Sequence, residues 1–423
     1  MKIKNINGNG YQLHLIKTNK FKTVLVKALF SDKLKKEDLT ARNLLFNNLL
    51  FSSAKYDTSR KMAIKREELF SASLYGRNYR RGSQIISEIN LSVIADKYCE
   101  DGSLKEALEF LFDILNNPNI KDNGFEKESF KVNYERLENS INDENEDPTH
   151  YAYTKFKEQI GQSKLYGTST LGTLEDLRKI TPENLYTYYK SFNKNNSLDI
   201  FIVGDFDFDE VEQVIKDNVK FEYKKSTFIL DEIPYDKTIY SKEEDSKFNQ
   251  SKIIFGGTLE NLTNSEKLYE GIVYNIILGN SPNSKLFRNV REKRSLAYNI
   301  SSSLNRLDNI FYIYAGISLK NKEETMEEVQ TQLEEMRNGN FSEKEVKNAK
   351  EMVLSIMREI DEYPGAMLDH YLNYLYFGNE SLDKQKEKIK SIKKEDIIKV
   401  AKKIEINTVF LLKEGQVGKD TNK

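Results

Sequence analysis

The chain repeats itself, and the repeat limits the folds open to it. Residues 125–148 read F-E-K-E-S-F-K-V-N-Y-E-R-L-E-N-S-I-N-D-E-N-E-D-P, and residues 341–364, 216 positions later, read F-S-E-K-E-V-K-N-A-K-E-M-V-L-S-I-M-R-E-I-D-E-Y-P. Each segment has a capping-type start, a long polar helix with an apolar stripe, and a proline that interrupts it or begins the next helix. A second pair, residues 174–185 and 386–397, follows in the same order, which favours a duplication.

The length of the chain agrees with two copies of one domain. A chain of 423 residues is too long for one ordinary core and suits two domains of about 200 residues each. We therefore predict two homologous α+β domains in tandem, at residues 1–222 and 249–423. Residues 223–248 are charged, contain Pro234 and show no clear periodicity, so we expect an extended linker there.

Helical and strand-like patterns alternate irregularly along both halves. Helical periodicity marks residues 40–51, 104–115, 265–278 and 284–293. Strand-like runs lie at residues 23–30, 85–94, 198–203, 253–256, 298–304, 311–317 and 408–412. Because several strand pairs are close in sequence, the pattern predicts mixed or mostly antiparallel sheets covered by helices, not a doubly wound parallel sheet.

Composition argues against several classes of function. Lys and Arg number 65 and Asp and Glu number 66, with no block of basic residues, so we expect no nucleic-acid partner. The N-terminal residues lack the apolar run of a signal peptide, and no stretch approaches a bilayer span, so we expect no membrane partner and a cytoplasmic location. Cys99 is the only cysteine, and we interpret it as a small apolar residue instead of a nucleophile.

Two longer segments carry a family resemblance that extends over about residues 13–415. Residues 275–298 read N-I-I-L-G-N-S-P-N-S-K-L-F-R-N-V-R-E-K-R-S-L-A-Y, and residues 165–196 contain L-Y-G-T-S-T-L-G-T-L-E-D-L followed by a strand ending at Gly204 and Asp205. These segments resemble the insulinase/pitrilysin-type zinc proteases, which include mitochondrial processing peptidase. The resemblance implies a processing-peptidase/LuxS-like metallohydrolase fold. It also implies that Ser281 or Asn283 caps the helix leading to Arg291.

The family's zinc motif, H-x-x-E-H, is missing from the first half. It aligns best with L-L-F-N-N-L-L-F, which puts Leu44 and Asn48 at the histidine positions and Asn47 at the glutamate position. The third family ligand falls near Ser140. None of these groups is a zinc ligand of useful strength, and a register shift to Asn43 and Asn47 is no better. The three histidines, at positions 14, 150 and 370, share no helical turn, so we expect no metal and no cofactor in this chain.

The family's charge-stabilising pair, in contrast, matches Arg291 and Tyr298. A guanidinium and a phenol can stabilise the negative charge that peptide hydrolysis places on a carbonyl oxygen. In two-subunit members of the family this pair can act in trans. The alternative is structural, since an arginine at a helix C-terminus and a tyrosine on a strand are common without any catalytic role.

The resemblance therefore predicts a zinc-less subunit of a two-subunit peptidase that encloses unfolded peptides with a homologous zinc-bearing partner. Residues 73–83 also resemble zinc-less bacterial members that are encoded with such a partner and associated with modification of elongation factor P. The arginines in this segment, at 77, 80 and 81, favour a solvated loop over an acidic-ligand site. Two alternatives stay open: a non-catalytic binding scaffold, which could be a homodimer, and an active peptidase with an unrecognised metal site.

Overall fold

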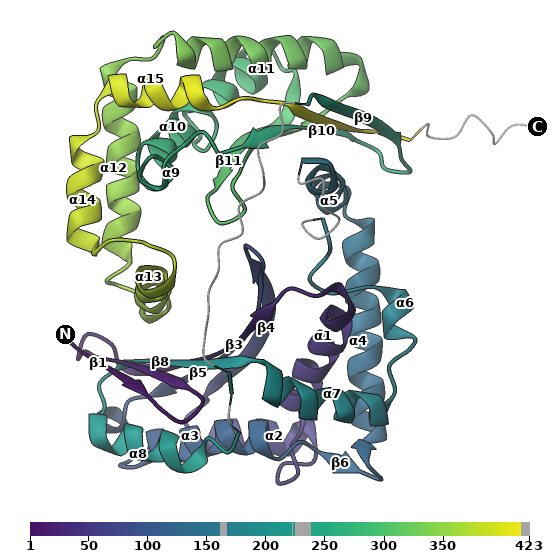
Figure 1. Ribbon diagram of the computed structural model, residues 1–423, viewed down its shortest axis with the longest axis vertical. Helices are drawn as coiled ribbons and strands as arrows, with labels where there is room; N and C mark the ends of the chain where they lie inside the picture. The colour runs from purple at the N-terminus through teal and green to yellow at the C-terminus, as the bar shows by residue number, and fades with distance from the viewer. Residues whose placement is uncertain (161–166, 222, 225–237, 416–423) are drawn as a thin grey trace, which may run out of the picture. The chain divides into compact units, whose positions relative to one another are not determined.

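The chain forms two compact units, each built on one β-sheet (Figure 1). The computed structural model describes residues 1–160, 167–221, 223–224 and 238–415. Unit 1 spans Met1–Asp143, Ser169–Ile229 and Glu359–Phe377, and unit 2 spans Glu144–Thr168, Leu230–Arg358 and Gly378–Lys423. Each unit therefore contains a segment that belongs in sequence to the other half of the chain.

Unit 1 contains a six-stranded sheet in the order β1-β2-β8-β3-β5-β4. Only the β2–β8 pair is parallel. The strands are β1 (Lys2–Asn7), β2 (Gln12–Lys17), β3 (Thr23–Lys33), β4 (Ser73–Arg81), β5 (Gln84–Ile94) and β8 (Ser197–Gly204), and a separate pair is β6 (Ile120–Lys121) and β7 (Gly124–Phe125). The prediction of a mixed, mostly antiparallel sheet is confirmed.

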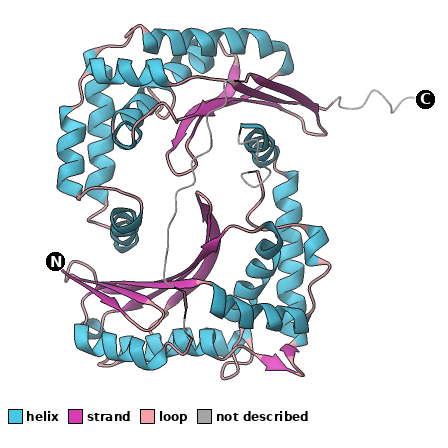
Figure 2. Cartoon of the chain, viewed as in Figure 1, coloured by secondary structure: helices cyan, strands magenta, loops and turns pink. Residues whose placement is uncertain are grey.

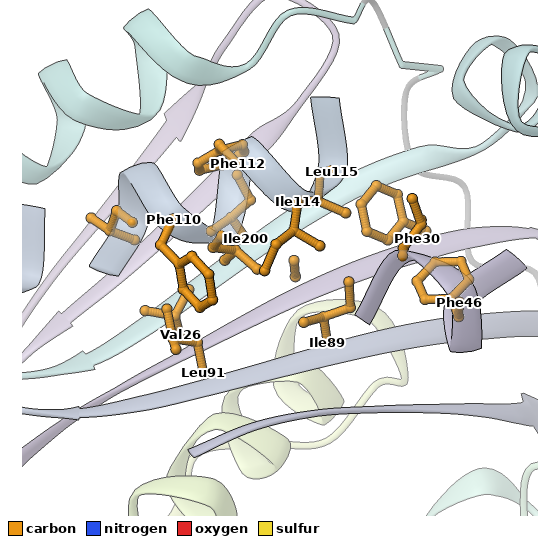
Figure 3. Packing of buried hydrophobic residues seen from close by; sticks show 14 of the residues in the cluster. Val26, Phe30, Phe46, Ile89, Leu91, Phe110, Phe112, Ile114, Leu115 and Ile200 are labelled. Carbon is orange, nitrogen blue, oxygen red and sulfur yellow. The ribbon is translucent and has the colours of Figure 1, made fainter. Parts of the chain in front are cut away.

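Most helices of unit 1 cover one face of this sheet and bury a large apolar core there, whereas α13 (Pro364–Tyr376) packs on the other face (Figures 2 and 3). Successive strand side chains point to opposite faces, so Val26, Phe30, Ile89 and Leu91 all reach the helices. The helices of unit 1 are α1 (Lys36–Phe51), α2 (Ser59–Glu68), η1 (Asp96–Tyr98), α3 (Ser103–Asn116), α4 (Lys127–Glu146), α6 (Leu174–Leu177), α7 (Pro182–Asn195), α8 (Phe208–Asn218) and α13 (Pro364–Tyr376).

Unit 2 repeats this plan around a five-stranded sheet in the order β11-β12-β10-β13-β9. Only the β9–β13 pair is parallel. The strands are β9 (Tyr240–Asp245), β10 (Ser251–Thr258), β11 (Ala297–Asn305), β12 (Ile310–Ile317) and β13 (Thr408–Lys413). The helices are α5 (Pro148–Ile160), α9 (Asn264–Leu268), α10 (Glu270–Leu278), η2 (Phe287–Lys293), η3 (Leu319–Asn321), α11 (Lys322–Arg337), α12 (Glu343–Glu359), α14 (Leu382–Ser391) and α15 (Lys394–Lys403).

The order of elements matches the predicted duplication. The segments of the first sequence match are α4 with the start of α5 and α12 with the start of α13, and those of the second are α6–α7 and α14–α15. The two prolines that close the first match, Pro148 and Pro364, begin α5 and α13. These two equivalent helices are the ones that the halves exchange, since α5 belongs to unit 2 and α13 to unit 1.

The exchanged helices are attached in different ways. Ala152, Phe156 and Ile160 of α5 pack against apolar side chains of β10, β12 and β13. A Cβ added to Gly256 on β10 would lie 2.3 Å from the Phe156 ring, so glycine is needed for this close approach. On α13, Asp369 pairs with Lys27 of β3 at 2.6 Å, and Tyr376 donates a hydrogen bond to Asp199 of β8.

Three sequence expectations differ from the structure. Part of the predicted linker is strand β9, which pairs with β13, while residues 225–237 lie outside the described residues. The helix predicted at residues 265–278 is divided at Tyr269 into α9 and α10. The segment 73–83, predicted to be a solvated loop, forms strand β4 and the turn after it, because it pairs along its length with β5.

The division into domains at residues 1–222 and 249–423 stays a prediction. The compact units differ from it by the two exchanged helices.

None of the helices in the described part of the chain combines the length and the hydropathy needed to cross a bilayer.

Phe156→Ala is expected to destabilise unit 2 by about 3–5 kcal/mol, because it removes a fully buried ring that fills the space above Gly256. Urea unfolding followed by circular dichroism would measure this change. Lys155→Ala on the same helix is the control and should cost less than about 1 kcal/mol, since its ion pair with Glu158 is partly exposed to solvent. Equal effects of the two substitutions would contradict the packing of α5 described above.

Candidate functional site

The arginine of the family pair lies on a π-helical segment, η2, in unit 2. Leu286 and Val290, both fully buried, anchor this segment, and Arg291 lies in its last turn with an exposed side chain. The capping residue is Ser284, whose Oγ accepts a hydrogen bond from the Phe287 backbone N–H at 3.4 Å. The prediction of Ser281 or Asn283 as the cap is therefore wrong; the Ser281 hydroxyl donates instead to the Ile276 carbonyl of the preceding helix.

Three arginines follow one another at intervals of three residues, and their environments differ. Arg288 pairs with Glu345 of α12, and Arg294 pairs with Glu328 of α11 at 2.6 Å. Among the residues that the structure describes, no carboxylate pairs with Arg291. Its guanidinium carbon lies 4.7 Å from the centre of the Phe287 ring. The Arg291 guanidinium thus lies over an aromatic ring, and among the described residues its N–H donors have no carboxylate partner.

A tight turn connects this segment to Tyr298. Ser295 has a φ of 53°, and its N–H donates to the Arg291 carbonyl at 3.1 Å, while the Leu296 N–H donates to the Val290 carbonyl at 3.0 Å. Strand β11 begins immediately afterwards, and its pairing with β12 is irregular between Ala297 and Asn299. Tyr298 occupies this bulge with 64% of its surface exposed. Arg291 and Tyr298 therefore lie on the predicted elements, a helix end and the next strand, and their use in a reaction stays a prediction.

The positions of the missing zinc motif lie on α1 in unit 1. Leu44 and Asn48 are one turn apart and are 0% and 1% exposed, while Asn47 points to solvent. The Asn48 amide donates to the Leu44 carbonyl at 2.8 Å, and its oxygen accepts from Asn133 of α4 at 3.5 Å. Asn133 also donates to the Ser129 carbonyl at 2.8 Å. Two amides therefore connect α1 and α4 beside the positions that align with the family's histidines.

Asn133, and not Ser140, is the residue of α4 that contacts Asn48. Ser140 lies two helical turns further along, is exposed, and donates its hydroxyl to the Arg136 carbonyl at 3.0 Å. Sequence alone does not distinguish the two positions, because residues seven apart lie on nearly the same face of a helix. Only the packing of α4 against α1 distinguishes the two. The alignment of Ser140 with the third family ligand stays a prediction.

These residues do not fit a zinc ion. Leu44 has no donor atom, and neutral amides are weak ligands that cannot act as a general base. The described residues contain no cluster of three or more His, Cys, Asp or Glu side chains suited to a metal.

A buried ionic cluster on the α13 side of the unit 1 sheet was not predicted from the sequence. Glu88 of β5 is 1% exposed and accepts hydrogen bonds from Arg77 at 3.1 and 3.2 Å and from Tyr79 at 2.8 Å. Lys27, which pairs with Asp369, lies 4.0 Å from the same carboxylate. Burial alone would raise the pKa of Glu88, but Lys27 and the hydrogen-bond donors lower it below its ordinary value of 4.5. Arg77 is therefore engaged within the protein.

Comparison with known proteins agrees with these observations. Residues 179–353 match the family described as "Peptidase M16 inactive domain". The "Probable inactive metalloprotease YmfF" of Bacillus subtilis is 26% identical over 410 residues, which is 96% of this chain and 96% of the relative. Over nearly its whole length the chain is similar to an inactive M16-type metalloprotease. The insulinase/pitrilysin-type resemblance of the motifs is thereby confirmed.

Two further matches are a second relative and a solved structure. The "Uncharacterized zinc protease YmxG" of Bacillus subtilis is 24% identical over 302 residues, 70% of this chain and 72% of that protein. A conserved protein from Enterococcus faecalis, known from its crystal structure, superposes with a TM-score of 0.91 at 29% identity and covers 99% of this chain and 100% of its own. The predicted fold is therefore confirmed over the whole chain.

A zinc site can be rebuilt if Asn48 and Asn133 mark the ligand positions. Leu44→His, Asn48→His and Asn133→Glu together should bind one zinc ion, because Leu44 and Asn48 are one helical turn apart and the Asn48 and Asn133 side chains are already 3.5 Å apart. The zinc content of the purified variant and the rise of its Tm on zinc addition would measure binding.

The matched control moves the histidines by one residue. Asn43→His, Asn47→His and Asn133→Glu should not bind zinc, because Asn47 is exposed whereas Asn48 contacts α4. Zinc binding by this control, and not by the first variant, would show that the register proposed for the degenerate motif is wrong.

Glu88→Gln should destabilise unit 1 by about 1–3 kcal/mol at pH 7, because Arg77 and Lys27 lose a buried ionic partner. The pKa of this carboxyl is lower in the folded than in the unfolded chain, so its contribution is complete above about pH 4.5 and is lost as the pH falls through the folded-state pKa. Urea unfolding of both proteins at several pH values should show the difference shrinking below pH 4.5. A difference that stays constant would argue against the ionic role of Glu88.

Proposed function

We propose that this chain is the zinc-less subunit of a two-subunit peptidase. It supplies one half of a peptide-binding chamber and presents Arg291 and Tyr298 to a zinc site carried by a homologous partner subunit. The observation that carries this proposal is the contrast between the two sites. Leu44 and Asn48, which align with the two histidines of the family motif, are buried and neutral, while Arg291 and Tyr298, which align with the family's arginine and tyrosine, are exposed.

The environment of Arg291 suits a group that acts on another molecule. An arginine that serves only the fold would be expected to pair as Arg288 and Arg294 do. When water adds to a peptide carbonyl, negative charge develops on its oxygen, and fixed N–H and O–H donors lower the barrier by stabilising that charge. Arg291 and Tyr298 have donors of both kinds, and they require no metal bound to this chain.

The open edges of the sheets support binding of an extended peptide. Exposed edge strands commonly carry charged residues, which prevent unwanted pairing. Strands β1, β4 and β9 follow this rule, whereas β11, which contains Tyr298 and forms an edge of the unit 2 sheet, has the uncharged sequence A-Y-N-I-S-S-S-L-N. A peptide that adds to β11 would run past Tyr298.

The relatives support a partner of the same family. In Bacillus subtilis the chain has one relative described as a probable inactive metalloprotease and another described as a zinc protease. A zinc-less chain and a zinc-bearing chain of one fold are the two components that the proposal requires.

Arg291→Ala combined with Tyr298→Phe is expected to abolish peptide cleavage by the mixed complex while assembly is retained. The loss should be about 100-fold or more, the effect of removing a preorganised donor to a developing oxyanion. Cleavage of a quenched fluorescent peptide and size-exclusion chromatography of the complex would measure the two properties.

Arg294→Ala is the matched control, since it removes an arginine from the same segment that is already paired with Glu328. Its kcat should stay within about twofold of wild type. If the double variant cleaves as fast as this control, the role of the pair in trans is excluded.

The alternative is a non-catalytic scaffold that binds a peptide or protein, as a homodimer or with a modification enzyme. The amide contact between Asn48 and Asn133 suits either function, because it stabilises the fold without a metal. Purification of the chain from its native cell distinguishes the two: a zinc-bearing M16 subunit in the same complex supports the peptidase, and its absence supports the scaffold.

A further inference from the structure

We propose that Phe287 is a positioning residue that orients the Arg291 guanidinium for the reaction. This inference rests on the proposed function, because it assigns a role within the same site. Its basis is the position of the Arg291 guanidinium over the Phe287 ring. This role requires no contact between Phe287 and the substrate.

The backbone that carries both residues is fixed on two sides. Arg288 connects η2 to α12 through Glu345, and Arg294 connects the end of the segment to α11 through Glu328. Asn289 adds a hydrogen bond from its amide to Gln332 of α11 at 2.7 Å. The freedom that remains at this site is therefore mainly in the Arg291 side chain, which has several rotatable bonds and an exposed end.

The Phe287 ring restricts that freedom. A guanidinium that lies on an aromatic face is held by its flat side, so its N–H groups point outward along the plane of the ring. The π-helical geometry of residues 287–293 is uncommon and occurs frequently at functional sites, and the segment ends at the turn that leads to Tyr298. The stack thus fixes the direction of the Arg291 donors before a peptide arrives.

This geometry predicts a specific kinetic effect. Without the ring, the Arg291 guanidinium would adopt several conformations, and only a fraction of them would contact the developing oxyanion. The value of kcat should therefore fall while KM stays nearly constant. A purely structural role of Phe287 would instead lower the amount of folded complex or change binding.

The experiment compares Phe287→Leu, which removes the ring, with Phe287→Tyr, which keeps it. In the mixed complex with the zinc-bearing subunit, Phe287→Leu should lower kcat about three- to tenfold with KM within twofold of wild type, while Phe287→Tyr should retain kcat. Wild-type kcat for Phe287→Leu, or an equal loss for both variants, would overturn the positioning role. Equal Tm values for the two variants exclude a general loss of fold.

Two further measurements separate this inference from the proposed function. If Arg291→Ala has no effect on cleavage, the proposed function fails; if Arg291→Ala is inactive but Phe287→Leu is normal, only the positioning role fails. In the isolated chain, NMR of arginine-labelled protein should show Arg291 side-chain protons shifted upfield by the ring current. The shift should persist in Phe287→Tyr and disappear in Phe287→Leu, and its absence in the wild type would contradict the stacking on which the inference depends.

Discussion

The packing of Phe156 against Gly256 is the contact on which the core of unit 2 depends. It places a helix from the first half of the sequence on the sheet built by the second half, and α13 makes the reciprocal exchange in unit 1. Neither unit is complete without a segment from the other half. The exchange also explains why the equivalent prolines at 148 and 364 matter, because each begins a helix that leaves its own half.

The two exchanged helices illustrate different ways of stabilising one architecture. Burial of an aromatic ring such as Phe156 contributes several kcal/mol and tolerates small shifts. Hydrogen-bonded ionic groups, such as Lys27 with Asp369, contribute less net energy but permit only one arrangement. The duplicated helices have therefore diverged: α5 places the Phe156 ring against β10, whereas α13 adds the Lys27–Asp369 ion pair and the Tyr376–Asp199 hydrogen bond to its buried apolar residues.

Much of the fold could be predicted from the sequence, and the reasons for the failures are local. Buried strands such as residues 85–94 and the repeated polar helices have strong periodicity, so their identity was clear. Strand β4 was missed because its arginines and tyrosines resemble a solvated loop, and its pairing with β5 is a long-range property. At the site, Leu44 and Asn48 could be aligned with a motif, whereas Asn133 could not be chosen over Ser140, because helix register is set by packing that no single segment encodes.

The amide contact between Asn48 and Asn133 has a consequence for how this lineage can change. Restoring one ligand at a time would place a histidine or a carboxylate in a buried, metal-free position, and each such step would weaken the protein before any ion could bind. A metal centre at these positions thus requires several replacements at once, because each single replacement lowers the stability of the protein before zinc can bind.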